Sequence, residues 1–239
     1  EHRIKAAVGH DMTSLVSCGY PLQDFIIAIV DPSTHILCNS EEVGEIWVQG
    51  TSVAKGYWQR DDETQSVFNA YTADGQGPYL RTGDLGCLIH GELYVTGRLK
   101  EMLIIRGRNH YPADLERTAL SVMDGVRCCA AIHVEADHAS LVVLLIETDR
   151  HLYREFQEDM TAQHMPKVLM ALQKAVADGH DLSLDHVLFL SPGAIPKTSS
   201  GKTQRLLCKA RYLAGELDPL WQWQKPEVPS ARRLEEVAL

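Results

Sequence analysis

The chain has 239 residues, of which 45% are hydrophobic and 23% are charged. This apolar content can fill one core of ordinary size or two small ones, and it excludes a chain that is disordered throughout. Uninterrupted apolar runs reach only six residues, as from Leu141 to Ile146, whereas a bilayer-spanning helix needs about 20. We therefore expect no membrane span.

The charge and the cysteine content further restrict the kinds of protein that this chain can be. The chain carries 23 basic and 32 acidic residues, a formal net charge of −9, which disfavours a nucleic-acid binder because phosphate contacts need clustered Lys and Arg. Its six cysteines form no C-x-x-C pair, and its eleven histidines show no zinc-binding spacing. We expect reduced thiols, no metal site and a cytoplasmic location. The chain opens without Met and without an apolar signal-peptide core, which favours a piece of a longer protein.

Residues 22–97 contain short β-rich runs separated by glycine turns. These runs are Phe25 to Val30, Glu45 to Gln49, Tyr79 to Leu85, Cys87 to Ile89 and Glu92 to Val95. Strands of this length and spacing predict a small antiparallel sheet or distorted barrel.

After residue 111 the pattern changes to alternating helices and strands. Pro112 begins a predicted helix, and Pro166 is expected to break another. The remaining predicted elements are strands Arg127 to Val134, Leu141 to Glu147 and His186 to Leu190, helices Arg150 to Ala177 and Lys202 to Leu217, and a linker from Glu216 to Leu239. The chain is thus predicted to be α+β, with a β-rich subdomain, a hinge and a compact mixed α/β domain.

The segment Arg81-Thr82-Gly83-Asp84-Leu85 is the first candidate for a binding site. Asp84 follows a glycine at the end of a predicted strand, where its carboxylate can accept hydrogen bonds from a vicinal diol such as a ribose. The alternative is a turn aspartate that accepts hydrogen bonds from its own backbone.

A second candidate segment joins the two predicted parts of the chain, from Gly97 to Pro112. It contains four basic residues and one acid, which are Arg98, Lys100, Arg106, Arg108 and Glu101. Glycines near both ends would let the backbone change direction, as a hinge between domains requires. The alternative is an exposed basic linker.

The third candidate segment runs from Pro196 to Arg205 and differs from a phosphate-binding loop. Seven residues separate Gly193 from Gly201, whereas a Walker A motif has four between its glycines. We expect a flexible Ser/Gly turn that delivers Lys202 to the start of a helix. Residues 197–211 contain five basic residues and no acid, which suggests an anionic ligand such as phosphate or carboxylate. The alternative is a solvated helix face.

The order and spacing of these three segments resemble the adenylate-forming superfamily, which includes acyl-CoA synthetases, luciferases and peptide-synthetase adenylation domains. The run from Gly44 to Gly50, followed by Gly56-Tyr57-Trp58, resembles an earlier motif of the same series. Within the superfamily, Leu15 to Gly19 and Arg106 to Pro112 are most similar to fatty acyl-AMP ligases. The resemblance covers residues 15 to about 215.

The resemblance implies a role for each motif residue. Asp84 would hold the ribose hydroxyls of ATP, and Arg98 would also contact the nucleotide. Lys100 matches the hinge about which a small C-terminal domain rotates, and Lys202 would bridge the substrate carboxylate and the α-phosphate. The implied domains are residues 1–97, the last β-rich subdomain of the large adenylation domain; 98–101, the hinge; 102–217, the small C-terminal domain; and 218–239, a linker or tail.

The implied activity converts a fatty acid and ATP, with Mg²⁺ on the triphosphate, to an acyl-adenylate and pyrophosphate. The acyl group would then pass to the phosphopantetheine thiol of an acyl carrier protein, in lipid or polyketide biosynthesis. Electrostatics agrees with this role for Lys202, because two anions about 4 Å apart repel by about 4 kcal/mol at an effective dielectric constant of 20. An ammonium group between them would offset much of that repulsion.

The superfamily's phosphate loop, adenine-binding motif and acyl-tunnel walls would lie upstream of Glu1. The chain is therefore expected to be the C-terminal portion of such an enzyme, to need the upstream N-terminal part of the adenylation domain as its partner, and to be inactive alone. Two alternatives stay open: an acyl-CoA synthetase fragment, and a non-catalytic module of the same fold that binds a lipid or a partner. The joint presence of Asp84, Arg98 and Lys202 argues against the second.

Overall fold

The computed structural model of the chain describes residues 14–136, 139–158 and 164–226. The chain divides into two compact units, Glu1–Met102 and Leu103–Leu239, and each unit has its own sheet. No helix among the described residues is long and apolar enough to cross a bilayer.

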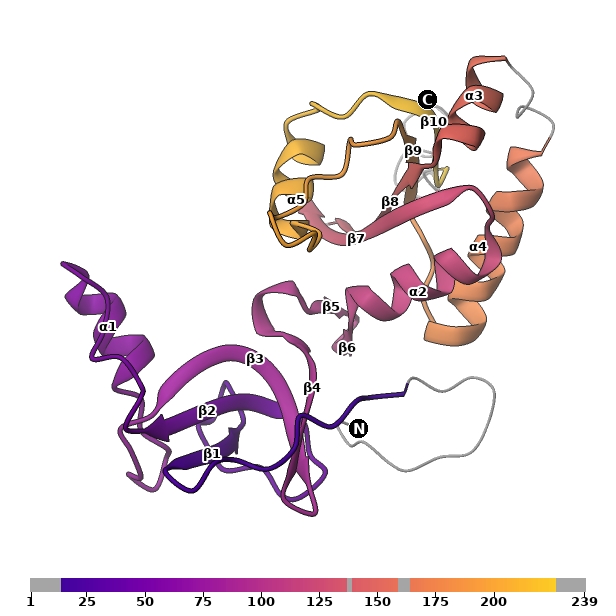
Figure 1. The fold of residues 1–239 in the computed structure, drawn as a ribbon. Helices are drawn as coiled ribbons and strands as arrows, with labels where there is room; N and C mark the ends of the chain where they lie inside the picture. Colours follow the sequence, from indigo (N-terminus) through magenta and orange to yellow (C-terminus); the bar gives the residue numbers. More distant parts are fainter. Residues whose placement is uncertain (1–13, 137–138, 159–163, 227–239) are drawn as a thin grey trace, which may run out of the picture. The chain divides into compact units, whose positions relative to one another are not determined.

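The first unit is built on a four-stranded antiparallel sheet with the order β1-β2-β3-β4 (Figure 1). Its strands are β1 (Phe25–Val30), β2 (Gly44–Gly50), β3 (Leu80–Ile89) and β4 (Glu92–Arg98), with helix α1 (Asp61–Phe68) between β2 and β3 and a short 3-10 helix η1 (Leu99–Glu101) after β4. The predicted antiparallel sheet is confirmed. It is open, with β1 and β4 at its two edges, so the distorted barrel is corrected to an open sheet.

Two predicted strands of the first unit form one strand in the structure. Tyr79 to Leu85 and Cys87 to Ile89 belong to β3, whose pairing with β4 shifts register between Leu85 and Gly86. A Cβ at Gly86 would lie 2.4 Å from the carbonyl oxygen of Tyr94, so the irregularity requires a residue without a side chain. Glycine, which we interpreted as a turn residue, here lies inside a strand.

The core of the first unit is centred on Trp47 of β2, which is completely buried. The centroid of its ring lies 6.1 Å from that of Tyr79 and 5.3 Å from that of His35. Ala28 and Val30 of β1 complete this cluster with Ala70. Aromatic packing of this kind fixes β1, β2 and the start of β3 against one another.

The second unit contains a four-stranded mixed sheet with the order β10-β9-β8-β7 and a small β5-β6 hairpin (Figure 1). The strands are β5 (Leu103–Ile105), β6 (Arg108–His110), β7 (Val126–Ala136), β8 (Ala139–Thr148), β9 (His186–Leu190) and β10 (Pro219–Gln224), and the helices are α2 (Pro112–Val122), α3 (Arg150–Gln157), α4 (Met165–His180) and α5 (Arg205–Leu213). Strands β8 and β9 are parallel, and the other two pairs of the large sheet are antiparallel.

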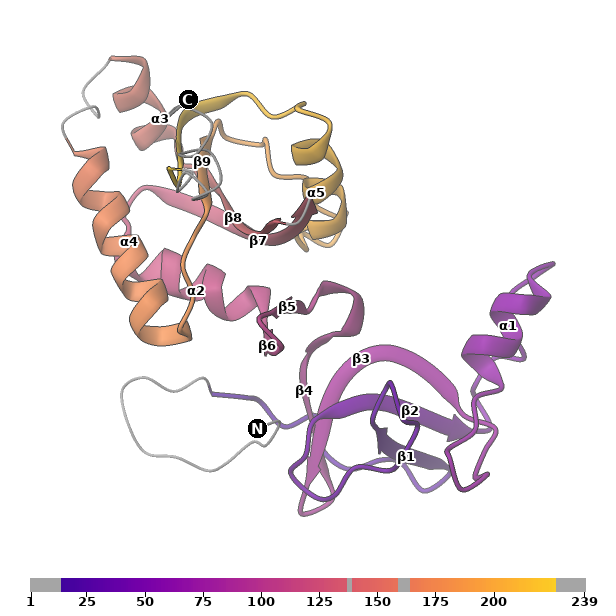
Figure 2. The same ribbon diagram turned by 180° about the vertical axis from the view of Figure 1, so that it is seen from behind.

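Helices cover both faces of the large sheet in the second unit (Figure 2). Leu144 and Ile146 of β8 belong to the core cluster that includes α2 and α4, whereas Val143 and Leu145 belong to the cluster that includes Cys208 of α5. Alternate residues of a strand point to opposite faces. This explains why β8, buried on both sides between β7 and β9, is almost entirely apolar.

Two predictions for the second unit need correction, and a third is confirmed. The helix expected from Lys202 to Leu217 is confined to α5, because residues 197–203 form a turn closed by a bridge between Lys197 and Thr203. The break expected near Pro166 is confirmed: the predicted helix from Arg150 to Ala177 is two helices, and Pro166 lies in the first turn of α4. The linker expected from Glu216 onward contains β10, which pairs with β9. The rest of that linker, residues 227–239, lies outside the described residues.

Candidate functional site

Asp84 and Arg98 meet across the β3-β4 ladder of the first unit. The two residues are paired in the strand register, and Arg98 Nε donates a hydrogen bond to Asp84 Oδ1 at 2.9 Å. Their side chains are 34% and 65% exposed. The pair therefore presents a carboxylate and a guanidinium together at the last pair of the β3-β4 ladder, partly exposed to solvent, where both can contact a polar ligand.

The backbone that carries Asp84 is held by a buried carboxylate on β2. Gly83 adopts a φ of +71°, which favours glycine, and its N–H donates to Glu45 Oε1 at 3.2 Å. The other oxygen of Glu45 accepts from Arg81 Nη2 at 2.8 Å and from Trp47 Nε1 at 2.9 Å. Glu45 is 2% exposed, so a single buried group fixes the Arg-Thr-Gly-Asp segment to the core.

Thr82 adds a second local restraint on Asp84. Its hydroxyl donates to the carbonyl oxygen of Ile46 at 2.7 Å and accepts from the backbone N–H of Asp84 at 3.0 Å. The turn aspartate considered as an alternative would use its carboxylate to accept backbone hydrogen bonds. Here the carboxylate accepts from Arg98, and the threonine supplies the local backbone contact.

Lys100 lies in η1, directly after β4, and its side chain is exposed. The N–H of Met102 donates to the carbonyl oxygen of Arg98 at 3.1 Å, which closes this short turn. The division into compact units falls immediately after it, between Met102 and Leu103. The assignment of residues 98–101 as a hinge stays a prediction.

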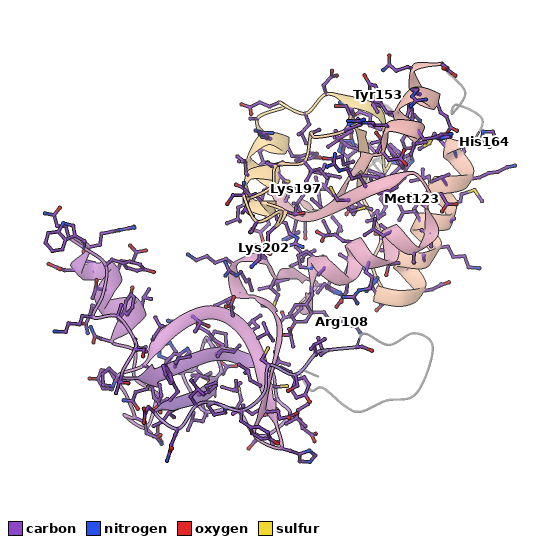
Figure 3. The ribbon with its side chains drawn as sticks, in the orientation of Figure 1. Arg108, Met123, Tyr153, His164, Lys197 and Lys202 are labelled. Atoms are coloured by element: carbon purple, nitrogen blue, oxygen red, sulfur yellow. The ribbon has the colours of Figure 1, made fainter. Side chains whose placement is uncertain are left out.

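Lys202 belongs to the second unit and lies on a tight turn before α5. The N–H of Thr198 donates to the carbonyl oxygen of Lys202 at 2.8 Å, and the N–H of Lys202 donates to Thr198 Oγ1 at 3.0 Å. Gly201 completes the turn with a φ of +83°. Figure 3 shows Lys202 and Lys197 on this segment. The sequence predicted a flexible delivery loop, but the turn is closed by its own hydrogen bonds.

The side chain of Lys202 is exposed. Among the residues that the structure describes, its ammonium group forms no salt bridge or hydrogen bond. It is thus free to pair with an anion from outside its own unit. The structure brings Asp84 and Arg98 together, and it places Lys202 in the other compact unit.

Sequence reasoning missed the buried carboxylates behind these motifs. Glu45 lies on the apolar strand β2, and Glu116 lies on the buried face of α2 beside Leu115 and Ala119. A charged residue inside an apolar pattern is the one available signal for such a group, because buried charges need partners. Within the described ranges, no cluster of three or more His, Cys, Asp or Glu side chains forms a metal site.

Comparison with known families gives two matches. The family described as Disco-interacting protein 2-like, AMP domain, matches residues 100–221, just over half of the chain. The AMP-binding enzyme family matches residues 4–58.

Individual relatives agree with these matches. The chain is 43% identical over 213 residues to the medium-chain-fatty-acid–[acyl-carrier-protein] ligase JamA of Moorena producens, covering 88% of this chain and 34% of that protein. It is 37% identical to a putative fatty-acid–CoA ligase, fadD21, of Mycobacterium leprae, covering 89% and 36% of the two chains. The chain therefore spans about a third of the length of these curated relatives.

A solved structure shares the fold. The structure of McyG A-PCP complexed with phenylalanyl-adenylate matches with a TM-score of 0.69 and 27% identity, covering 95% of this chain and 36% of that one. Similarity over both compact units agrees with the motif order in the sequence. The chain belongs to the Disco-interacting protein 2-like AMP-domain family, within the adenylate-forming superfamily of AMP-binding enzymes.

Proposed function

We propose that this chain contributes the C-terminal part of a fatty acyl-AMP ligase. The complete enzyme joins a fatty acid to ATP, forming an acyl-adenylate and pyrophosphate, and passes the acyl group to the phosphopantetheine thiol of an acyl carrier protein. The observation that carries the proposal is the exposed Lys202 ammonium, held on a closed turn without an ion pair in the described part of its unit. The name of the similar ligase JamA supports the choice of acid and acceptor.

The first half-reaction brings two anions together. A carboxylate oxygen of the fatty acid attacks the α-phosphorus of ATP, and the bond from that phosphorus to the oxygen bridging to the β-phosphate breaks, releasing pyrophosphate. At about 4 Å the two charges repel by about 4 kcal/mol at an effective dielectric constant of 20. Lys202 placed between them offsets this repulsion most strongly in the transition state, where the negative charge concentrates.

Asp84 and Arg98 hold the nucleotide in this proposal. The carboxylate of Asp84 accepts hydrogen bonds from the ribose hydroxyls, while Arg98 keeps that carboxylate oriented and contacts the nucleotide itself. Magnesium bound to the triphosphate would neutralise part of its charge and favour departure of pyrophosphate.

The second half-reaction needs a different arrangement of the same residues. Rotation of residues 103 onward about Lys100 would withdraw Lys202 after adenylation and make room for the acceptor thiol. Lys202 would then be required for forming the acyl-adenylate but not for consuming it. This difference makes the proposal testable with one variant.

The test uses the complete protein that contains this chain, with Lys202→Ala and, as a matched control, Lys174→Ala at an exposed lysine of α4. We expect pyrophosphate release with a fatty acid to fall at least 100-fold in the first variant only. Transfer from supplied acyl-adenylate to holo-carrier protein should be retained in both. An unchanged rate of pyrophosphate release in Lys202→Ala would refute the proposal and favour a non-catalytic module.

A second acceptor is favoured by one observation, the similarity to a putative fatty-acid–CoA ligase. The same acyl-adenylate can react with the thiol of coenzyme A. Thioester formation measured with coenzyme A and with holo-carrier protein, at equal thiol concentration, separates the two. We expect the carrier protein to be the faster acceptor, and a faster reaction with coenzyme A would assign the chain to an acyl-CoA synthetase.

A further inference from the structure

The segment that carries Lys202 is anchored at its C-terminal end by an ion pair with two hydrogen bonds. Arg205, the first residue of α5, donates from Nε to Glu116 Oε1 and from Nη2 to Glu116 Oε2, both at 2.7 Å. Both side chains are largely buried, with 20% of Arg205 and 11% of Glu116 exposed. A two-point pair of this kind fixes orientation as well as distance.

Glu116 also joins this pair to the sheet. Its Oε1 accepts a hydrogen bond from the backbone N–H of Ala131 on β7 at 2.9 Å. One buried carboxylate therefore connects α2, β7 and α5. Because a buried charge is costly unless its partners are in place, moving Arg205 away from its place relative to the sheet would leave the carboxylate partly unpaired.

The N-terminal end of the same segment is held by another buried carboxylate. Glu147 of β8 is 1% exposed, and its Oε2 accepts from the backbone N–H of Ile195 at 3.0 Å. The carbonyl oxygen of Pro196 then accepts from the N–H of Gln204 at 2.9 Å, which closes the base of the turn. Residues 196–204 thus project from a base that is fixed on both sides.

This anchoring is unusual for a segment rich in Ser, Thr and Gly, whose backbone would otherwise sample many conformations. Lys202 lies three residues before Arg205, and its own side chain is exposed. Catalytic groups must be held within about 0.5 Å of the productive position, and a displacement of about 1 Å can cost on the order of 100-fold in rate. The long side chain of Lys202 needs a fixed backbone to meet this requirement.

We propose that Glu116 and Arg205 are positioning residues for Lys202. Their ion pair sets the place of the turn relative to the sheet, and so directs the Lys202 ammonium to the α-phosphate and the carboxylate. The proposal rests on the proposed adenylation activity and concerns only its first half-reaction. It assigns to this pair a role beyond holding α5 in the fold.

The experiment measures both half-reactions in the complete protein for Glu116→Gln and for Arg205→Lys, which keeps the charge but loses the two-point geometry. We expect acyl-adenylate formation to fall at least tenfold, with little change in KM for ATP, while acyl transfer from supplied acyl-adenylate stays within twofold. The control is Arg117→Gln on the same helix, which removes an exposed pair with Asp114. It should change neither half-reaction. A similar loss of both half-reactions in the two test variants would overturn the proposal, because loss of folded enzyme affects both alike.

A double-variant measurement separates positioning from any direct role. In a Lys202→Ala background, Glu116→Gln should cause no further loss of acyl-adenylate formation, because the carboxylate acts only through the lysine. A further tenfold loss would overturn the proposal. If Lys202→Ala alone leaves adenylation unchanged, the proposed function fails and this inference fails with it. If Lys202→Ala lowers adenylation while Glu116→Gln and Arg205→Lys do not, only the positioning role is refuted.

Discussion

Asp84 and Arg98 occupy paired positions in the register of β3 and β4, so the strand ladder itself brings the carboxylate and the guanidinium to 2.9 Å. Both side chains keep substantial exposure, and exposed ion pairs typically contribute only about 0–1 kcal/mol to stability. The pair is therefore better suited to binding a ligand than to stabilising the fold.

This relationship predicts that Asp84→Asn weakens ATP binding and leaves stability almost unchanged. Loss of charge-assisted hydrogen bonds to the ribose, each worth about 1.5–3 kcal/mol, should raise KM for ATP by about tenfold or more. The measurement is pyrophosphate release as a function of ATP concentration in the complete protein, together with thermal unfolding. An unchanged KM for ATP would contradict the assignment of Asp84 to the nucleotide.

Glu45, unlike Asp84, should contribute strongly to stability, because its carboxylate is buried and joins Arg81, Trp47 and Gly83. Breaking a buried ion pair typically costs about 3–5 kcal/mol. We expect Glu45→Gln to lower the free energy of unfolding by about 3 kcal/mol, since Arg81 keeps some exposure. Denaturant unfolding checks this. The control is Arg60→Gln, which removes the ion pair between the residue preceding α1 and Glu63 in its first turn and should cost less than about 1 kcal/mol. Equal losses of unfolding free energy in the two variants would contradict the role of Glu45 in holding the Arg-Thr-Gly-Asp segment to the core.

Two glycine-to-alanine substitutions should change stability in opposite directions. At Gly86 a Cβ would lie 2.4 Å from a backbone oxygen and 2.8 Å from Ile46 Cδ1, and overpacking typically costs about 1–3 kcal/mol. Gly179 lies in α4 with nothing within 4 Å of the added atom, so Ala should stabilise the helix by about 0.5–1 kcal/mol. Denaturant unfolding of both variants provides the comparison, and a stabilised Gly86→Ala would refute the close approach of β3 and β4.

Much of the fold follows from local sequence patterns. The strand predicted from His186 to Leu190 is β9 with the same ends, and the helix predicted to begin at Pro112 is α2. The strand β10 was missed because Trp221 and Trp223, placed in the predicted linker, become part of a strand only through pairing with β9. Such long-range pairing leaves little trace in a short stretch of sequence.

In the candidate site, too, some residues can be identified from local sequence and others only from the fold. Asp84, Arg98 and Lys202 stand in motifs with a recognisable order, so the sequence alone identifies them as candidates. Glu116 is 89 positions from Arg205, and its neighbours indicate only a buried helix face. No local pattern predicts which distant side chain meets a given carboxylate. The groups that position a site therefore become visible only with the fold.

The last prediction concerns pH and the partly buried histidines of the second unit. Burial lowers the pKa of His110, His133, His180 and His186 below the ordinary value of 6.5. The unfolded chain then binds more protons than the folded one as the solution is acidified, so protonation favours unfolding. The stability contributed by the neutral rings is complete above pH 6.5 and is lost as the pH falls through and below that value.

We expect the free energy of unfolding to decrease between pH 7 and about pH 5, as measured by denaturant unfolding at several pH values. Asp31 has its pKa lowered to about 2 by hydrogen bonds from Ser33 and Thr34, so its contribution is lost only below its unfolded-state value of 3.8 and lies outside this window. His186, whose Nδ1 lies 2.8 Å from the hydroxyl of Tyr212, provides the matched variant. His186→Gln should make the decrease smaller, because one titrating ring is removed. A free energy of unfolding that stays constant or rises from pH 7 to pH 5 would show that burial of these rings does not govern the acid sensitivity of the unit.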